Sequence, residues 1–152
     1  ATIMIIGASL IIFVHTIFSL PILNYWFVAV VLVIVLGVAL SLVPSAMWPS
    51  VPKIIPENQL GTAFSLIFWI QNWGLMGIPA LIGYVLDKTN PEVLAAKELV
   101  AKGEDVLIPF YDYTFPMMIF ASLGVLAILV ALLLKAEDKR KGYGLELPNI
   151  KK

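Results

Sequence analysis

The chain has 152 residues, of which 61% are hydrophobic and 13% are charged, and its mean hydropathy is +0.97. A soluble domain is about 45–50% apolar and about 25% charged, so this composition excludes an ordinary soluble fold and is typical of a membrane protein. The formal net charge of zero provides no basic field for a nucleic acid partner, and the absence of cysteine excludes disulfides, thiol catalysis and thiolate metal sites.

Two apolar segments fill the first third of the chain, where no Asp, Glu, Lys or Arg precedes Lys53. About 20 apolar residues are enough for a helix to cross a bilayer. Spans are therefore predicted over about residues 3–20 and 25–51, and the short turn between them favours antiparallel neighbours. The second span contains three prolines near its end, where we expect the helix to be interrupted: Pro44, Pro49 and Pro52.

Two further spans are predicted over about residues 58–86 and 115–134. Pro79 lies inside the third span, where we expect a bend. Helices are the expected form, because unpaired backbone groups in lipid are costly. The predicted fold is an all-α integral membrane protein with four transmembrane helices in a single region over residues 1–152.

A long polar connection is predicted over residues 87–114. Asn90 is expected to cap a short surface helix over about residues 91–102, with Pro91 in its first turn, and Gly103 follows as a stop signal. We interpret this helix as a solvated linker without chemistry.

Basic residues predict the orientation of the chain in the membrane. The tail over residues 135–152 is rich in lysine and arginine, and Lys53 lies in the short link on the same predicted side. Positive charges favour the cytoplasm, so we expect a cytoplasmic C-terminus in a cell (inner) membrane and an outward loop over residues 87–114. We expect a disordered end after the basic residues of the tail. Because Ala1 enters an apolar segment at once, the chain is predicted to be a fragment of a longer polypeptide.

Polar side chains inside a membrane are expensive and are therefore functional candidates. Gln71 and Asn72 lie at the middle of the third span, flanked by Trp69 and Trp73. Amides beside aromatic rings are typical of the wall of a solute cavity, and we interpret the pair in this way. The alternative is that both amides hydrogen-bond a neighbouring helix.

The end of the second span has polar residues on one helical face. Ser41, Ser45 and Trp48 follow at spacings of four and three. Ser45 and Trp48 are candidates for solute binding, although close helix packing together with Gly37 is the better interpretation of the serines.

Signals for other kinds of site are weak. His15 could in principle carry protons, but no acidic residue lies inside any predicted span, and a packed histidine is the better interpretation. There is no histidine pair, carboxylate pair within a span or glycine-rich phosphate loop. The sequence therefore predicts no enzyme, no metal site and no cofactor.

One run of motifs connects the second and third spans. It consists of Trp48-Pro49-Ser50-Val51-Pro52, Ile55-Pro56-Glu57, Leu60-Gly61-Thr62-Ala63 and Ile70-Gln71-Asn72. In these elements and their spacing the chain resembles the major facilitator superfamily of transporters, and more narrowly the group that contains major facilitator superfamily domain-containing protein 1. The resemblance is specific over about residues 45–87.

This resemblance implies that the four spans correspond to helices nine to twelve of a twelve-helix transporter. Helices ten and eleven of that fold line the central cavity, which agrees with the polar character of the second and third spans and places His15 on a peripheral helix. The implied function is the C-terminal part of a secondary active transporter that moves a small organic solute, with dipeptides as one candidate, by alternating access. Its partners would be the lipid bilayer and the missing N-terminal half.

Two alternatives remain open at this point. The chain could be a complete four-span protein that acts as an oligomeric exporter or an assembly subunit, which the even topology favours. A membrane-embedded enzyme is the less favoured alternative, because the sequence contains no catalytic constellation.

Overall fold

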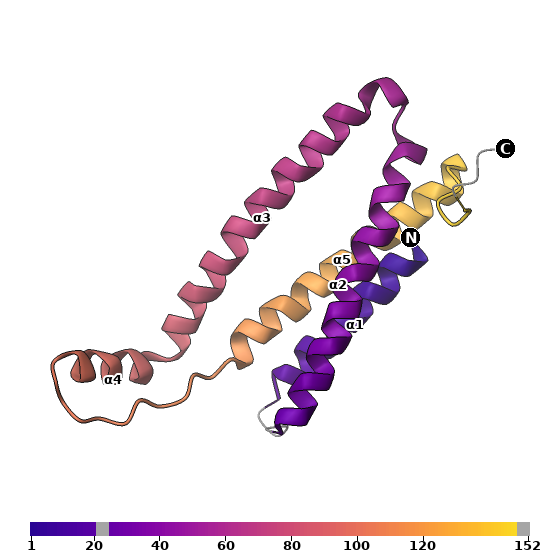
Figure 1. The fold of residues 1–152 in the computed structure, drawn as a ribbon. Coiled ribbons are helices and arrows are strands. Elements are labelled where there is room, and N and C mark those ends of the chain that lie inside the picture. Colours follow the sequence, from indigo (N-terminus) through magenta and orange to yellow (C-terminus); the bar gives the residue numbers. More distant parts are fainter. Residues whose placement is uncertain (21–24, 149–152) are drawn as a thin grey trace.

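The computed structural model describes residues 1–20 and 25–148, and all regular elements in those ranges are helices (Figure 1). They are α1 (Thr2–Phe18), α2 (Trp26–Ile54), the 3-10 turn η1 (Glu57–Gln59), α3 (Leu60–Thr89), α4 (Pro91–Ala101) and α5 (Thr114–Lys141). Three helical stretches are long and apolar enough to cross a membrane: α2, η1 with α3, and α5. The predicted all-α membrane fold is confirmed.

The first predicted span is shorter than the others. α1 has 17 residues, which gives a length of about 26 Å at 1.5 Å per residue. A hydrocarbon core is about 30 Å thick, so a fourth membrane crossing stays a prediction. Most of the predicted turn into α2 consists of residues 21–24, which lie outside the described residues.

The expected interruption of the second span is wrong. α2 continues as an α-helix to Ile54 through Pro44, Pro49 and Pro52, although each proline removes one backbone donor. A break would expose still more unpaired backbone groups, which is the costlier outcome in lipid. The Ser50 hydroxyl also donates a hydrogen bond of 2.7 Å to the Ala46 carbonyl within this stretch. α3 is also continuous through Pro79, and the bend expected there stays a prediction.

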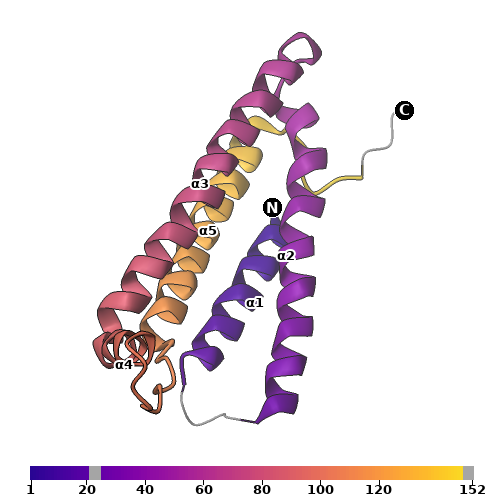
Figure 2. The same cartoon turned by 60° about the vertical axis from the view of Figure 1, so that its left-hand side comes forward.

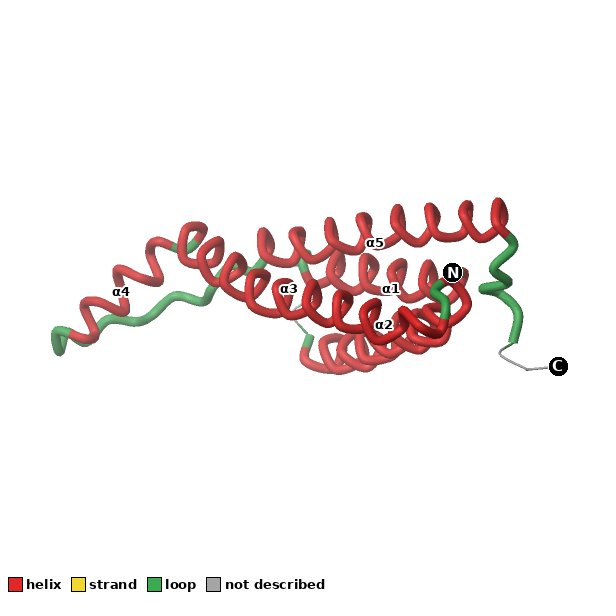
Figure 3. The backbone as a smooth tube through the Cα atoms, turned by 90° about the horizontal axis from the view of Figure 1, so that it is seen from above, coloured by secondary structure: helices red, strands yellow, loops and turns green. Residues whose placement is uncertain are grey.

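The core of the molecule is a layer of three helices in which α1 lies between α2 and α5 (Figures 2 and 3). Small residues set the close approach. A Cβ added to Gly7 would lie 3.1 Å from the Ala39 carbonyl oxygen on α2, and one added to Gly124 of α5 would lie 2.6 Å from the Ile12 Cγ1 on α1. Ala8, which is 1% exposed, lies beside Gly7. Small residues permit such contacts between membrane helices.

α3 stands apart from this layer. It leaves α2 at the η1 turn, diverges along its length, and ends near the start of α5 (Figure 1). None of its 30 residues is buried against the described part of the chain. The helix that carries the predicted amide pair is therefore the least covered of the long helices.

α4 is close to the predicted surface helix, but Asn90 does not cap it in the expected way. Asn90 occupies the N-cap position without a side-chain cap hydrogen bond. Its Oδ1 accepts a hydrogen bond of 2.6 Å from the backbone N–H of Asp112, and its Nδ2 donates to the carbonyls of Asp112, at 3.1 Å, and Leu86, at 2.8 Å. This fully buried amide ties the end of α3 to the segment that starts α5.

Replacement of Asn90 by alanine is expected to lower the free energy of unfolding by about 1–3 kcal/mol, because its two part-buried hydrogen bonds to the Asp112 backbone would be lost, each worth about 0.5–1.5 kcal/mol. Thermal unfolding in detergent measures this change. Asn58→Ala is the matched control, because Asn58 is exposed in η1. Equal melting temperatures for the two variants would show that the clamp contributes nothing.

α5 and the tail also differ from the prediction. α5 continues seven residues past the predicted end of the fourth span, to Lys141, and is capped by Gly142, which has a left-handed backbone (φ 69°). Residues 142–148 then fold back onto the ends of α1 and α2, where Leu145 is buried. The expectation of a disordered end is wrong for these residues, and residues 149–152 lie outside the described residues.

Candidate functional site

Trp48 joins α2 to α3 through two aromatic contacts. Its ring centroid lies 5.8 Å from that of Phe64 and 5.1 Å from that of Phe68, with tilted geometries. Both phenylalanines belong to α3 and are four residues apart, so they lie on one face of that helix. This cluster marks the side of α3 that faces α2.

Gln71 lies on the same side of α3 as this cluster. At about 100° per residue, position 71 is rotated by only about 20° from position 64. The Gln71 side chain is exposed and follows Phe68 by three residues along α3. α3 as a whole diverges from α2 after the η1 turn (Figure 1). An uncharged amide that can both donate and accept hydrogen bonds therefore lies on the same side of α3 as Phe64 and Phe68.

Trp69 is not brought to this cluster. It forms an edge-to-face pair with Trp73 at 6.0 Å, and both positions are rotated by about 160° from Gln71 around the helix. Asn72 lies between the two faces, about 100° from Gln71. The structure thus separates the predicted set into a Trp48–Gln71 side and a Trp69 side, and the role of each residue in solute binding stays a prediction.

The serines of α2 lie away from the helix contacts. Ser41 and Ser45 are exposed and donate hydrogen bonds of 2.8 Å to the carbonyls of Val38 and Leu42 in their own helix. An added Cβ at Gly37 would find no atom within 4 Å. In the described structure, the close packing expected at these positions occurs instead at Gly7 and Gly124. Both are small residues inside spans of otherwise bulky apolar residues, and this pattern could have predicted the contacts.

Sequence reasoning missed the two phenylalanines. Phe64 and Phe68 resemble ordinary apolar residues of a span, and their only signal is a spacing of four residues, which places them on one face. His15 is a packed residue, as interpreted above. Its Nδ1 lies 2.8 Å from the Ile11 carbonyl oxygen, and its ring centroid is 5.1 Å from that of Phe120 on α5.

Two charged groups of the polar connection have shifted pKa values. The Thr114 side-chain and backbone hydrogen bonds lower the pKa of Asp112, and the Tyr111 hydroxyl, 2.9 Å from the Lys97 Nζ, raises the pKa of that lysine. Both groups therefore keep their charges near neutral pH. Residues 1–20 and 25–148 contain no cluster of three histidine or acidic side chains that could hold a metal ion.

Part of the chain is similar to curated transporters. It is 50% identical over 52 residues to the lysosomal dipeptide transporter MFSD1 of Gallus gallus, a match that covers 34% of this chain and 12% of that protein. It is 37% identical over 73 residues to the MFSD1 proteins of Bos taurus and Homo sapiens, with 48% of this chain and 15% of each relative covered. No family profile and no solved structure matches the chain.

These relatives confirm the resemblance to the major facilitator superfamily and to its MFSD1 group. Together with the apolar helices they support a multi-pass membrane protein of the transporter class rather than an enzyme. The matched part is a small share, 12–15%, of the length of these relatives.

Proposed function

We propose that this chain is the C-terminal part of a secondary active transporter that moves a small organic solute across a membrane by alternating access. The observation that carries the proposal is the similarity to MFSD1 proteins, which are named lysosomal dipeptide transporters. Dipeptides are therefore the first solute class to test. The remaining helices, including the opposing N-terminal half, would come from the rest of a longer polypeptide.

The uncovered state of α3 supports this proposal. A 30-residue apolar helix with two amides at its middle and no buried residue in the described structure has surface available for further helices and for a solute. Solute sites of secondary transporters lie near the midplane of the bilayer, between two helical halves that move relative to each other. Gln71 and Asn72 lie near the middle of α3 and therefore fit that depth.

The chemistry of the Trp48–Gln71 side suits a dipeptide. A dipeptide has one peptide N–H and one peptide C=O between two charged ends, and the side-chain amide of Gln71 can satisfy either polar group of the peptide. The aromatic rings of Trp48 and Phe68 provide apolar surface for the side chains of the solute.

We further propose that the basic end of α5 and the Lys53 link face the cytoplasm of a cell membrane. Lys53 and the tail lie at the same end of the molecule, because the Lys53 Nζ contacts the carbonyls of Gly144 and Leu147. Positive charge at that end favours the cytoplasmic side.

Uptake by the longer protein in proteoliposomes tests the proposal. Liposomes containing the protein are offered a mixed pool of labelled dipeptides, with and without an imposed proton gradient. We expect uptake above that of protein-free liposomes, since a membrane transporter must concentrate or equilibrate its solute. Absence of uptake for every dipeptide, with a correctly folded protein, would refute the assignment of the solute class.

A further inference from the structure

The tail leaves α5 through a defined turn. The backbone N–H of Gly142 donates a hydrogen bond of 2.7 Å to the Asp138 carbonyl, and Gly142 and Gly144 have left-handed backbones with φ of 69° and 72°. Glycine adopts this conformation at little steric cost, and it commonly ends helices in this way. The chain is thereby directed back toward α1 and α2 rather than away from the bundle.

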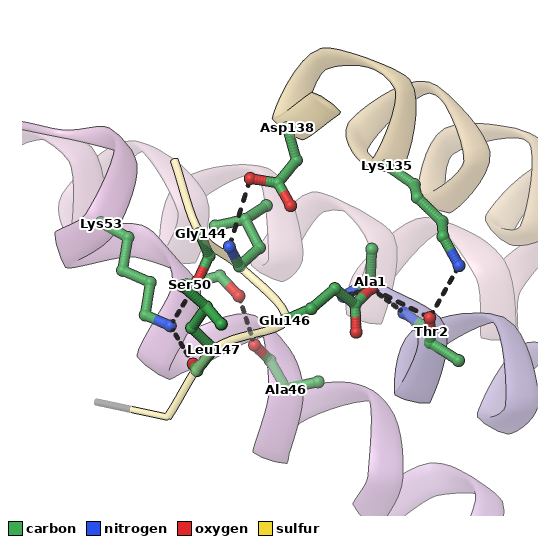
Figure 4. A network of polar contacts seen from close by, with 11 residues as sticks. Ala1, Thr2, Ala46, Ser50, Lys53, Lys135, Asp138, Gly144, Glu146 and Leu147 are labelled. Atoms are coloured by element: carbon green, nitrogen blue, oxygen red, sulfur yellow. Dashed lines mark hydrogen bonds and ion pairs between the residues drawn. The ribbon is translucent and has the colours of Figure 1, made fainter. Parts of the chain in front are cut away.

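Each of the three helices of the layer anchors the returning segment (Figure 4). On α5, the Asp138 Oδ1 accepts a hydrogen bond of 3.2 Å from the Leu145 N–H, and both residues are buried. On α1, the N–H and the hydroxyl of Thr2 each donate 2.9 Å hydrogen bonds to the Glu146 Oε1.

The anchor on α2 is a single ammonium group. The Lys53 Nζ donates hydrogen bonds to the carbonyl of Gly144, at 2.9 Å, and to that of Leu147, at 2.5 Å. Hydrogen bonds with one charged partner contribute more than neutral ones. Lys53 lies in the last turn of α2, so these bonds fix the end of that helix to the tail.

This end of α2 is also the part of the helix with the weakest backbone. Pro44, Pro49 and Pro52 each remove one intrahelical hydrogen bond, and prolines are the usual sites of helix bending. A cavity of about 410 Å³ lies between this stretch and the tail, lined among others by Pro49, Lys53 and Leu145. The stretch therefore has both a cause of bending and space in which to bend.

We propose that residues 142–148 form a latch that holds the proline-rich end of α2 against α1 and α5. With the latch closed, the three helices move as one rigid body. When the bonds of Lys53 open, the stretch from Pro44 to Ile54 bends about its prolines, and α3 moves with it because the two helices are joined by η1.

Hydrogen–deuterium exchange of the full-length protein in lipid nanodiscs tests the latch. Lys53→Met removes the ammonium group and keeps an unbranched apolar side chain. We expect exchange of the amides in residues 45–54 and 143–148 to become about tenfold faster or more, because two charge-assisted hydrogen bonds are lost. Exchange in residues 115–130 of α5 should stay unchanged.

Three further variants make the result specific. Lys139→Met removes a lysine of α5 at which the described structure shows no hydrogen bond to the tail, and it should leave exchange unchanged. Lys53→Arg retains a cationic donor and should restore most of the protection. Leu145→Asp places a charge in the buried anchor on α5 and should reproduce the effect of Lys53→Met.

Unchanged exchange in residues 45–54 for both Lys53→Met and Leu145→Asp would overturn the proposal. Faster exchange throughout the protein would overturn it as well, since that result indicates general unfolding. The measurement requires no solute, so a protein that fails to transport dipeptides can still show the latch, and the two proposals can fail separately.

Discussion

Replacement of Gln71 by alanine in the longer protein is expected to reduce dipeptide uptake by about ten- to hundredfold at low solute concentration. Gln71 lies on the side of α3 that faces α2, beyond the Trp48–Phe68 contact, and its amide is exposed in the described structure. Removal of the Gln71 amide would leave a peptide group of the enclosed dipeptide without its partner, which costs about 1–3 kcal/mol, and 1.4 kcal/mol corresponds to a tenfold change in affinity. Initial uptake rates measured across solute concentrations check this expectation.

Two controls separate solute binding from other effects. Gln59→Ala removes the same side chain from η1, outside the predicted midplane site, and should leave uptake unchanged. Asn72→Ala is expected to have a smaller effect than Gln71→Ala, because Asn72 is rotated by about 100° from it. If all variants fold and transport as the unmodified protein does, the amides serve helix packing and the site lies elsewhere.

Gly7→Leu is expected to be the most destabilising single change in the three-helix layer. The added Cβ alone would lie 2.9 Å from the Val43 Cγ2 and 3.1 Å from the Ala39 carbonyl oxygen. The Ala39 carbonyl is backbone and cannot rotate away, so α1 and α2 must separate. Overpacking typically costs about 1–3 kcal/mol, and the loss of the neighbouring helix contact adds to this cost. The melting temperature in detergent measures the change.

The matched control for this change is Gly37→Leu. Gly37 is also a glycine inside an apolar helix, but an added Cβ there meets no atom within 4 Å. Its melting temperature should stay close to that of the unmodified protein. A Gly7→Leu variant as stable as the Gly37→Leu variant would show that α1 does not approach α2 as closely as described.

Hydrophobicity determined most of what the sequence could predict. Long apolar runs require helices in lipid, so the positions of α2, α3 and α5 follow from composition, with boundaries shifted by a few residues where Lys53, Thr89 and Lys141 extend the helices into polar sequence. Motif spacing around Trp48 and Gln71 indicated the transporter resemblance, and the curated relatives confirm it.

Predictions from residue type and neighbouring sequence were wrong where contacts with distant groups, or the surrounding lipid, determine the structure. Asn90 has the residue type and position of a helix cap, but its amide hydrogen-bonds Asp112, 22 residues away. The prolines of α2 predict an interruption, but the helix continues past them. Neither outcome can be derived from the neighbouring residues alone. The bond partner of Asn90 lies elsewhere in the chain, and the continuity of α2 reflects the cost of unpaired backbone groups in the bilayer.

The sequence by itself determined the membrane class, the helical elements and the candidate amides, because hydropathy and side-chain chemistry are properties of single residues and their spacing. Only the tertiary structure decided that α1 lies between α2 and α5, that Gln71 and Trp69 face different sides, and that the tail binds Lys53. The physical reason is that each of these depends on contacts between atoms distant in sequence: glycine-permitted approach of helices, rotation of α3 set by the Trp48 cluster, and backbone carbonyls presented by a folded tail.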